Sequence, residues 1–357
     1  MNRNVYILAV VALLAYACTG VKVEEDPTGT VKVTCTADWS QVSATPSYVF
    51  DFAAARTLKS VHYYEDGIYT NQGDEDQFQM EPGEYETLFL SCTPQDAYRI
   101  ENKDSFLQSE LESLRVLSAS ISMMTPEEFA AQFGDFSPLI VRRYDTLPRP
   151  QAAPLYLASV RASIQANGEV QNLTFQPQPI HQQVSFRITI IPSDETVAPT
   201  RVVANITGTP YRVQMLSGHV DTGHMGQTFV EFQHVEGNDW ECSVQLLGIM
   251  SPEDPELITG PGIMHLRVEY GTIVPNGVNR DLNLKPYLDA QPLLRYTDEG
   301  DYYKSVATQA RFVVSEPLYL TASDTEHGGE EPVSPWKDPE DGDVHDILDG
   351  YDDEGNA

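Results

Sequence analysis

The densest group of metal-binding and catalytic residue types in the sequence is the segment HVDTGH, from His219 to His224. Two imidazoles and the carboxylate of Asp221 could converge on a metal ion if this segment forms a loop, since both groups are competent ligands. The spacing matches no common zinc signature, however, and a polar loop between two strands explains the same residues. We therefore assign no metal ligand here.

Carboxylates are concentrated at the C-terminal end of the chain. From Asp324 to Ala357 there are thirteen Asp or Glu residues and a single basic residue, Lys337. The segment 338–349 could attract calcium, but it lacks the D-x-D-x-D-G spacing of a calcium-binding loop. With so few apolar residues to bury, residues 323–357 are expected to form a flexible acidic tail.

The catalytic motifs that can be recognised from spacing are absent. The sequence contains no G-x-S-x-G, no H-E-x-x-H, no glycine-rich phosphate loop and no paired cysteine motif. We therefore predict a protein that is not an enzyme and has no cofactor. Three tyrosines beside a polar loop, Tyr63, Tyr64 and Tyr69, could stack on sugar rings, although tyrosines in strands more often serve packing.

The N-terminus carries the one residue to which we assign a chemical role. After Arg3, residues 5–17 are apolar, which is shorter than the stretch of about 20 residues that spans a bilayer and typical of a secretory signal. Cys18 follows the small residue Ala17, as in a lipid attachment site, although Ala15 stands where the bacterial lipobox usually has Leu. We predict a signal peptide over residues 1–17, acylation of Cys18 and a tether over residues 18–29.

The bulk composition excludes some partners. A net charge of −31 argues against nucleic acid, whose phosphates would repel the protein, and against docking onto anionic lipid. The length predicts two domains. Of the cysteines beyond Cys18, Cys35 and Cys92 fall in one predicted domain and could form a disulfide. Alternatively these two and Cys242 are three small buried residues.

The first half of the mature chain is predicted to form a β-sandwich. Apolar and polar residues alternate with the period of two that predicts half-buried strands, in residues 30–39, 48–52, 58–64 and 87–92. Asp66-Gly67 predicts a turn that ends the third strand, and Pro82-Gly83 predicts a tight turn. Several short strands at regular spacing are typical of a sandwich. Three prolines within residues 147–154 predict a linker, so the first domain is placed at residues 30–150.

Two helices are expected inside this region. Residues 105–117 place leucines at helical spacing. Thr125, Pro126 and Glu128 predict a second helix, because Thr caps the N-terminus, Pro fits the first turn and Glu completes a capping box.

The second half is predicted to be a second sandwich over residues 151–322. The strongest strand is Gln182–Ile191, where Val184, Phe186, Ile188 and Ile190 share one face. Further strands are predicted at residues 155–164, 170–177, 201–207, 211–216, 228–232, 240–247, 263–270, 281–284 and 311–320. Helix signals are nearly absent.

In order along the chain, several short motifs resemble the fimbrillin-related lipoproteins of the Bacteroidetes, and among them the fimbrial anchor proteins. They are Cys18, VKVTCTADW at 31–39, FQMEPGEYETLFL at 78–90, QQVSFRITI at 182–190 and Asn205-Ile206-Thr207-Gly208. The resemblance implies an all-β protein of two tandem transthyretin-like β-sandwich domains with minor helices. It also implies a lipid anchor in the outer membrane, exposure at the cell surface and other fimbrial subunits as partners, bound by β-strand addition.

The sequence departs from the polymerising members of that group. Those resemble subunits that are matured by cleavage after an N-terminal Arg, whereas here no Arg lies between Cys18 and Arg56. A chain that keeps its lipid suits an anchor, or alternatively a stand-alone surface lipoprotein that binds glycans or host ligands. Fold does not decide between these functions.

Overall fold

The computed structural model describes residues 29–42, 48–56, 60–69, 76–92, 97–102, 117–144, 147–192, 198–270, 277–297 and 302–320, with side chains described outside 48–56, 60–69, 76–78, 135 and 320. The predicted signal peptide, Cys18, most of the tether, the acidic tail and all but the last residue of the helix expected at 105–117 lie outside these residues. No helix of the described part is long and apolar enough to cross a bilayer.

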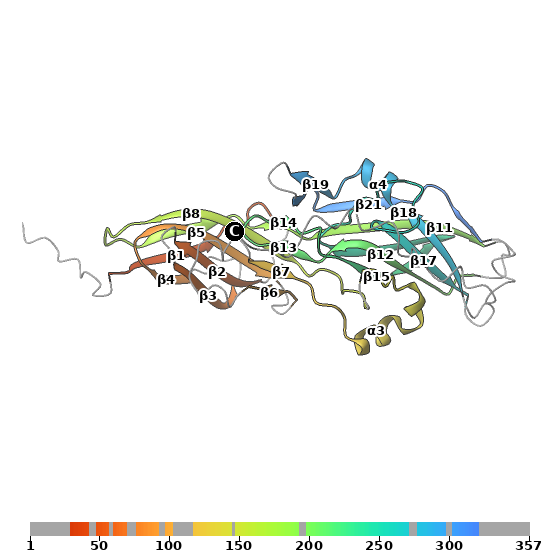
Figure 1. Ribbon diagram of the computed structural model, residues 1–357, viewed down its shortest axis with the longest axis horizontal. Coiled ribbons are helices and arrows are strands. Elements are labelled where there is room, and N and C mark those ends of the chain that lie inside the picture. Colours follow the sequence, from red (N-terminus) through yellow and green to blue (C-terminus); the bar gives the residue numbers. More distant parts are fainter. Residues whose placement is uncertain are drawn as a thin grey trace, which may run out of the picture.

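The all-β fold class with minor helices is confirmed. Figure 1 shows an elongated molecule with two β-rich halves along its long axis. The N-terminal half contains β1 (Val31–Ala37), β2 (Tyr48–Arg56), β3 (Ser60–Tyr69), β4 (Asp76–Met80), β5 (Gly83–Cys92), β8 (Leu155–Ile164), β9 (Gln171–Phe175) and β10 (Gln178–Pro179). The C-terminal half contains β11 (Gln182–Pro192), β12 (Arg201–Pro210), β15 (Met225–Glu236), β16 (Asp239–Leu246), β17 (Ile263–Glu269), β18 (Val278–Asn283), β21 (Gln309–Val313) and β22 (Leu318–Leu320).

A third set of short strands lies at the junction of the two halves. It consists of β6 (Arg99–Glu101), β7 (Ser118–Ser120), β13 (Arg212–Gln214), β14 (His219–Val220), β19 (Leu294–Thr297) and β20 (Tyr302–Ser305). These strands form one sheet in the order β19-β20-β14-β13-β7-β6. Segments that are far apart in the sequence therefore meet in this sheet.

The N-terminal half has three layers. The central sheet has the order β10-β8-β5-β2-β3, and the sheet β4-β1-β9 lies on one of its faces. On β5, Phe89 belongs to the core shared with Val33 of β1, whereas Leu90 belongs to the core shared with Val213 of β13. Successive side chains of a strand point to opposite faces, so the junction sheet covers the second face of the central sheet.

The position of β8 corrects the predicted division of the chain. We predicted that residues 155–164 begin the second domain, at residues 151–322. Instead β8 pairs with β5 along ten residues, from Leu155 opposite Cys92 to Ile164 opposite Gly83, and β9 pairs in parallel with β1. A period of two identifies a strand but not its neighbour. The strands β8 and β9 are therefore part of the N-terminal half and do not begin the second one.

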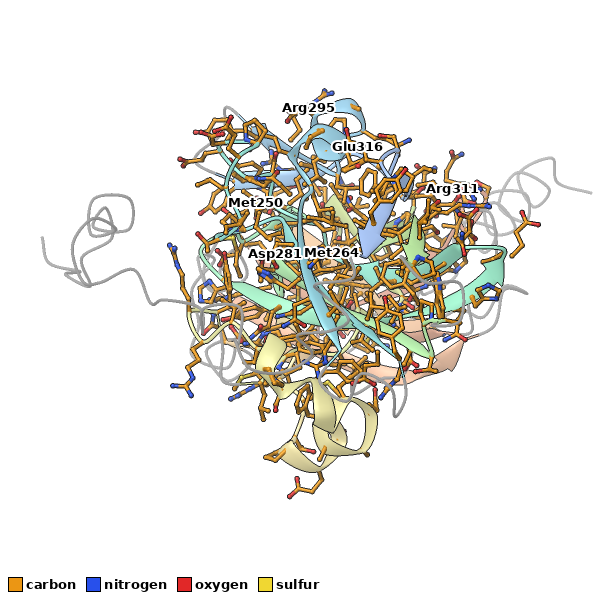
Figure 2. All side chains as sticks on the ribbon, turned by 90° about the vertical axis from the view of Figure 1, so that its right-hand side faces the viewer. Met250, Met264, Asp281, Arg295, Arg311 and Glu316 are labelled. Atoms are coloured by element: carbon orange, nitrogen blue, oxygen red, sulfur yellow. The ribbon has the colours of Figure 1, made fainter. Side chains whose placement is uncertain are left out.

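The C-terminal half is a curled sheet in the order β18-β17-β12-β15-β16-β11-β21. The long strand β15 pairs with β12 through its first part and with β16 through its last part, so it passes from one layer to the other. Seen end-on in Figure 2, Met264 lies inside the curled sheet, whereas Arg311 lies at its margin. The predicted strand at 182–191 is confirmed as β11, with the four expected side chains in the core.

The strand predicted at 311–320 is divided into two. Both β21 and β22 pair in parallel with β11, and Pro317, which has no backbone N–H to donate, lies between them. The short helix α4 (Lys285–Ala290) was not predicted. It places Leu288 in the core and the Tyr287 ring 6.2 Å from that of Phe312.

The predicted capping box at Thr125 is confirmed. The Thr125 hydroxyl accepts the Glu128 N–H at 3.2 Å, and the Glu128 carboxylate accepts the Thr125 N–H at 2.7 Å. The helix α3 (Pro126–Phe133) continues into the 3-10 helix η2 (Gly134–Leu139). Phe129 packs edge-to-face on Phe229 of β15, 5.4 Å between ring centroids, so this segment covers the outside of the C-terminal sheet.

Two predicted turns have other roles. Asp66-Gly67 lies within β3, at a register shift where Asp51 is opposite Glu65 and Val49 is opposite Ile68. A bulge absorbs the extra residue without ending the strand. Pro82-Gly83 joins β4 in an outer sheet to β5 in the central sheet, because the two strands pair with different neighbours.

Candidate partner-binding groove

The structure keeps His224 and Asp221 of the HVDTGH segment together and turns His219 to another partner. His224 Nδ1 lies 2.9 Å from the Asp221 carboxylate, and Arg212 donates a hydrogen bond to His224 Nε2 at 3.1 Å. His219 instead stacks on Tyr302, with ring centroids 5.4 Å apart. Both ring nitrogens of His224 therefore face protein groups, and among the described residues no group of three His, Cys, Asp or Glu is arranged to hold a metal ion.

The three described cysteines are buried, and no disulfide joins them. Cys35 belongs to the core on one face of the central sheet and Cys92 to the core on the other, so the sheet itself separates the two thiols. Burial raises the pKa of Cys242 to about 12, which suppresses its thiolate. The alternative of three small buried residues is the one that the structure supports.

The other residues considered as sites in the sequence lie outside the described side chains. Tyr63, Tyr64 and Tyr69 all lie on β3, outside the described side chains. Cys18 and the acidic segment 338–349 are outside the described residues.

The most distinctive feature of the molecule is an open edge of the central sheet. β5 occupies one edge of β8 over its whole length, whereas β10 pairs with the other edge only at Tyr156 and Leu157. Among the strands that the structure describes, none pairs with that second edge at residues 158–164. Figure 1 shows β8 along the upper margin of the N-terminal half. A bare strand edge is a template for pairing with another chain.

Two hydrogen bonds show in which direction the backbone N–H and C=O groups of β8 point. The Leu155 carbonyl points away from β5, because it accepts the Ile180 N–H at 2.9 Å. The Val160 carbonyl points toward β5, since it accepts the Thr87 hydroxyl at 2.6 Å. Because directions alternate in an antiparallel ladder, the N–H and C=O groups of residues 159, 161 and 163 face outward.

A groove of about 1000 Å³ runs beside residues 157–160 of this edge. One wall comes from the sheet β4-β1-β9 and its connections, through Thr174 and Gln41. The opposite wall comes from the junction sheet, through residues 215–218 and 304–308. The groove thus lies where all three layers of the N-terminal half meet.

Amides, hydroxyls and aliphatic groups dominate the lining. Among the described residues that line the groove, Lys304 is the only charged one, although the chain contains 53 acidic residues. A segment inserted here would meet backbone hydrogen-bonding groups at its edge and neutral side chains on both sides. The groove is therefore suited to an extended peptide rather than to a metal or a reaction.

The resemblance to fimbrial anchor proteins implied strand addition but pointed to no particular strand edge. The alternation of LYLASVRASI identified a strand, and nothing in it shows that the strand ends a sheet. The groove also depends on residues from four distant segments, which only the fold brings together.

No protein-family model matches the sequence, and neither does any curated protein. Among solved structures, the chain is similar to an adhesin candidate from Bacteroides ovatus, with a TM-score of 0.53 and 11% sequence identity over 85% of this chain and 96% of that one. The chain has the fold of this adhesin candidate.

Two further similar structures score lower. An adhesin candidate from Bacteroides thetaiotaomicron has a TM-score of 0.48 and 9% identity, covering 82% of this chain and 92% of that one. The fimbrial anchor protein of Porphyromonas gingivalis has a TM-score of 0.43 and 12% identity, covering 78% of this chain and 95% of that one. The adhesin fold is assigned from the first comparison alone.

Proposed function

We propose that the protein works at the cell surface in fimbrial anchoring or assembly and adhesion, by adding an extended segment of another fimbrial subunit to the open edge of β8. The observation that carries this proposal is the bare edge at residues 158–164 beside the groove. The fold shared with the Bacteroides ovatus adhesin candidate and the sequence resemblance to fimbrial anchor lipoproteins support it.

An added strand would gain interactions of two kinds. Main-chain hydrogen bonds would form to residues 159, 161 and 163, each worth about 0.5–1.5 kcal/mol net. Alternate side chains of the added strand would contact the two outer layers, because the open edge belongs to the central one. Backbone pairing gives affinity and the side-chain contacts give specificity, which is the logic of strand addition.

The proposal includes the lipid anchor. The mature chain would begin at Cys18, and acyl chains on its sulfur would hold it in the outer membrane. Residues 18–29 would act as a tether between the membrane and β1. Neither catalysis nor a cofactor has a role in this function.

The open edge can be tested at a single residue. The N–H of Ser159 faces outward, so Ser159→Pro removes one donor from the edge and leaves the ladder with β5 intact. Ser159→Ala changes the same side chain and keeps the N–H. In cells that express each variant, we expect sheared filaments to carry the native protein and Ser159→Ala, but to carry much less Ser159→Pro. Equal amounts of the two variants on filaments would exclude the β8 edge.

The anchor is tested with Cys18→Ala in the same cells. If the lipid holds the protein and the protein holds filaments, the variant leaves the membrane fraction and long filaments appear in the medium. If the native protein stays on the surface and never accompanies a filament, the alternative of a stand-alone surface lipoprotein replaces the anchor. Native protein found in the soluble periplasm would contradict both.

A further inference from the structure

The hairpin β19–β20 exposes an unusual number of aromatic rings. In the part of the chain with described side chains, the exposed aromatic residues are Tyr296, Tyr302 and Tyr319, and the first two belong to this hairpin. Tyr296 is 51% exposed. Its ring stands edge-to-face to Tyr303, with centroids 5.6 Å apart. Exposed tyrosines are costly to solubility and are common where a protein binds a ligand.

A pocket of about 420 Å³ lies on one face of this hairpin. Leu294 and Tyr303 form one wall, and the segment 249–251 with α4 and Pro292 forms the rest. Tyr296 lies directly opposite Tyr303 and two residues from Leu294, on the same face of the strand, so its ring extends this wall outward. The volume is within the range that holds small ligands.

Gly248 allows the two walls to approach each other. It has φ of +148°, and a Cβ at this position would lie 2.8 Å from three side-chain carbons of Leu294. The glycine therefore permits close contact between the hairpin and the segment 249–251. The pocket is built by this contact rather than left between loosely packed parts.

Polar groups converge on the apolar walls. The Asp289 side chain is 57% exposed and is held by Lys285, 3.3 Å away across one turn of α4. Ser251 also lines the pocket, and its hydroxyl donates to the Pro252 carbonyl at 3.4 Å, which leaves its oxygen lone pairs able to accept. A flat aromatic surface next to a carboxylate and hydroxyls is suited to a sugar ring, whose C–H face is apolar and whose hydroxyls donate to carboxylates.

The charge of the site favours neutral sugars over acidic ones. The lining includes the carboxylate of Asp289 and no Lys or Arg among the described residues. Arg295 lies on the opposite face of β19 from Leu294 and Tyr296, and Figure 2 shows it at the outer margin of the molecule. The chain as a whole carries a net charge of −31. Acidic sugars would be repelled.

We propose that the pocket between hairpin β19–β20 and α4 binds a neutral sugar residue of a glycan, stacked on Tyr296 with its hydroxyls on Asp289 and Ser251. The site is separate from the groove at β8, whose lining from this region is residues 304–308. Glycan binding therefore does not depend on the proposed strand addition, and each can fail without the other.

Affinity gel electrophoresis of the mature protein tests this proposal. The gels contain a neutral polysaccharide (galactomannan, glucomannan, xyloglucan or dextran) or the acidic polygalacturonate. We expect retardation by at least one neutral polysaccharide and none by polygalacturonate. Tyr296→Ala should weaken binding about tenfold or more, because it removes the stacking ring. Tyr319→Ala, which removes an exposed tyrosine of β22, should bind like the native protein.

Three results would overturn the proposal: no retardation in any neutral gel, stronger retardation by polygalacturonate, or equal retardation of Tyr296→Ala and the native protein. Asp289→Asn provides a second variant that keeps the size of the side chain, and it should also weaken binding. Ser159→Pro should bind the glycan normally, and Tyr296→Ala should still accompany filaments. These crossed variants separate failure of the glycan site from failure of the proposed strand addition.

Discussion

The two halves of the molecule treat the edge of a long strand in opposite ways. In the C-terminal half, the second edge of β11 is occupied by β21 and β22, which the chain supplies from its own last strands. In the N-terminal half, the described strands occupy the second edge of β8 only at Tyr156 and Leu157. The first edge is therefore closed by the chain's own strands, whereas the second is the one to which we propose that a partner strand is added.

The side chains at the two edges differ accordingly. β21 places Ala310 and Phe312 in the core, and the Phe312 ring lies 5.4 Å from that of Phe186 on β11. The exposed part of the β8 edge instead presents Ala158 and Ser159 beside the groove. The buried Phe312 ring thus holds the strand that closes the β11 edge, whereas among the described strands none pairs with the second edge of β8 beside Ala158, Ser159 and Val160.

The closed edge should give the largest effect on stability. Phe312→Ala removes a buried ring and leaves a cavity between β21 and β11, so we expect a loss of about 3–5 kcal/mol in the free energy of unfolding. Val313→Ala on the same strand changes a side chain that is 51% exposed and should have little effect. Denaturant unfolding of both variants measures the difference. Equal stabilities would show that β21 contributes little to the closed edge.

The connection between β10 and β11 should make the free energy of unfolding depend on pH. His181 lies between β10 and β11, with Nδ1 3.1 Å from the outward-facing N–H of Leu155. Burial lowers the pKa of the imidazole below its ordinary value of 6.5. Below pH 6.5 the unfolded chain then binds more protons than the folded one, so stability declines as the pH falls through the folded-state pKa.

Unfolding measured at pH 7.5 and pH 5 checks this expectation. The decline should be smaller in His181→Gln than in the native protein. His234→Gln, at an exposed histidine, should keep the native decline. If His181→Gln and the native protein lose the same stability, the imidazole at the link does not control the pH dependence.

The open edge should give the smallest effect on stability. Ser159→Pro removes an N–H that faces away from β5, so we expect the free energy of unfolding to change by less than about 1 kcal/mol. The same variant is expected to lose its partner segment. A loss of stability as large as that of Phe312→Ala would show that this edge is not open in the folded protein.

Features that involve residues close in sequence could be predicted, whereas the pairing of strands that are distant in sequence could not. The capping box at Thr125 and the alternation of β11 involve residues that are close in sequence, and both are confirmed. The bond between Thr87 and Val160 joins residues 73 positions apart, and no pattern within LYLASVRASI indicates it. The helix α4 is too short to produce a periodic signal. The groove and the sugar pocket were missed because distant segments form both.

The parallel pairing of β22 with β11 has a consequence for the proposed lipid-anchored protein. β11 leaves the junction at Gln182 and ends at Pro192, and β22 runs in the same direction to Leu320. Figure 1 shows β1 starting at the far end of the N-terminal half and β11 extending to the opposite end of the molecule. A chain tethered before β1 would thus carry the end of β11 and its partner β22 outermost. The groove would lie midway, above the membrane and below the tip.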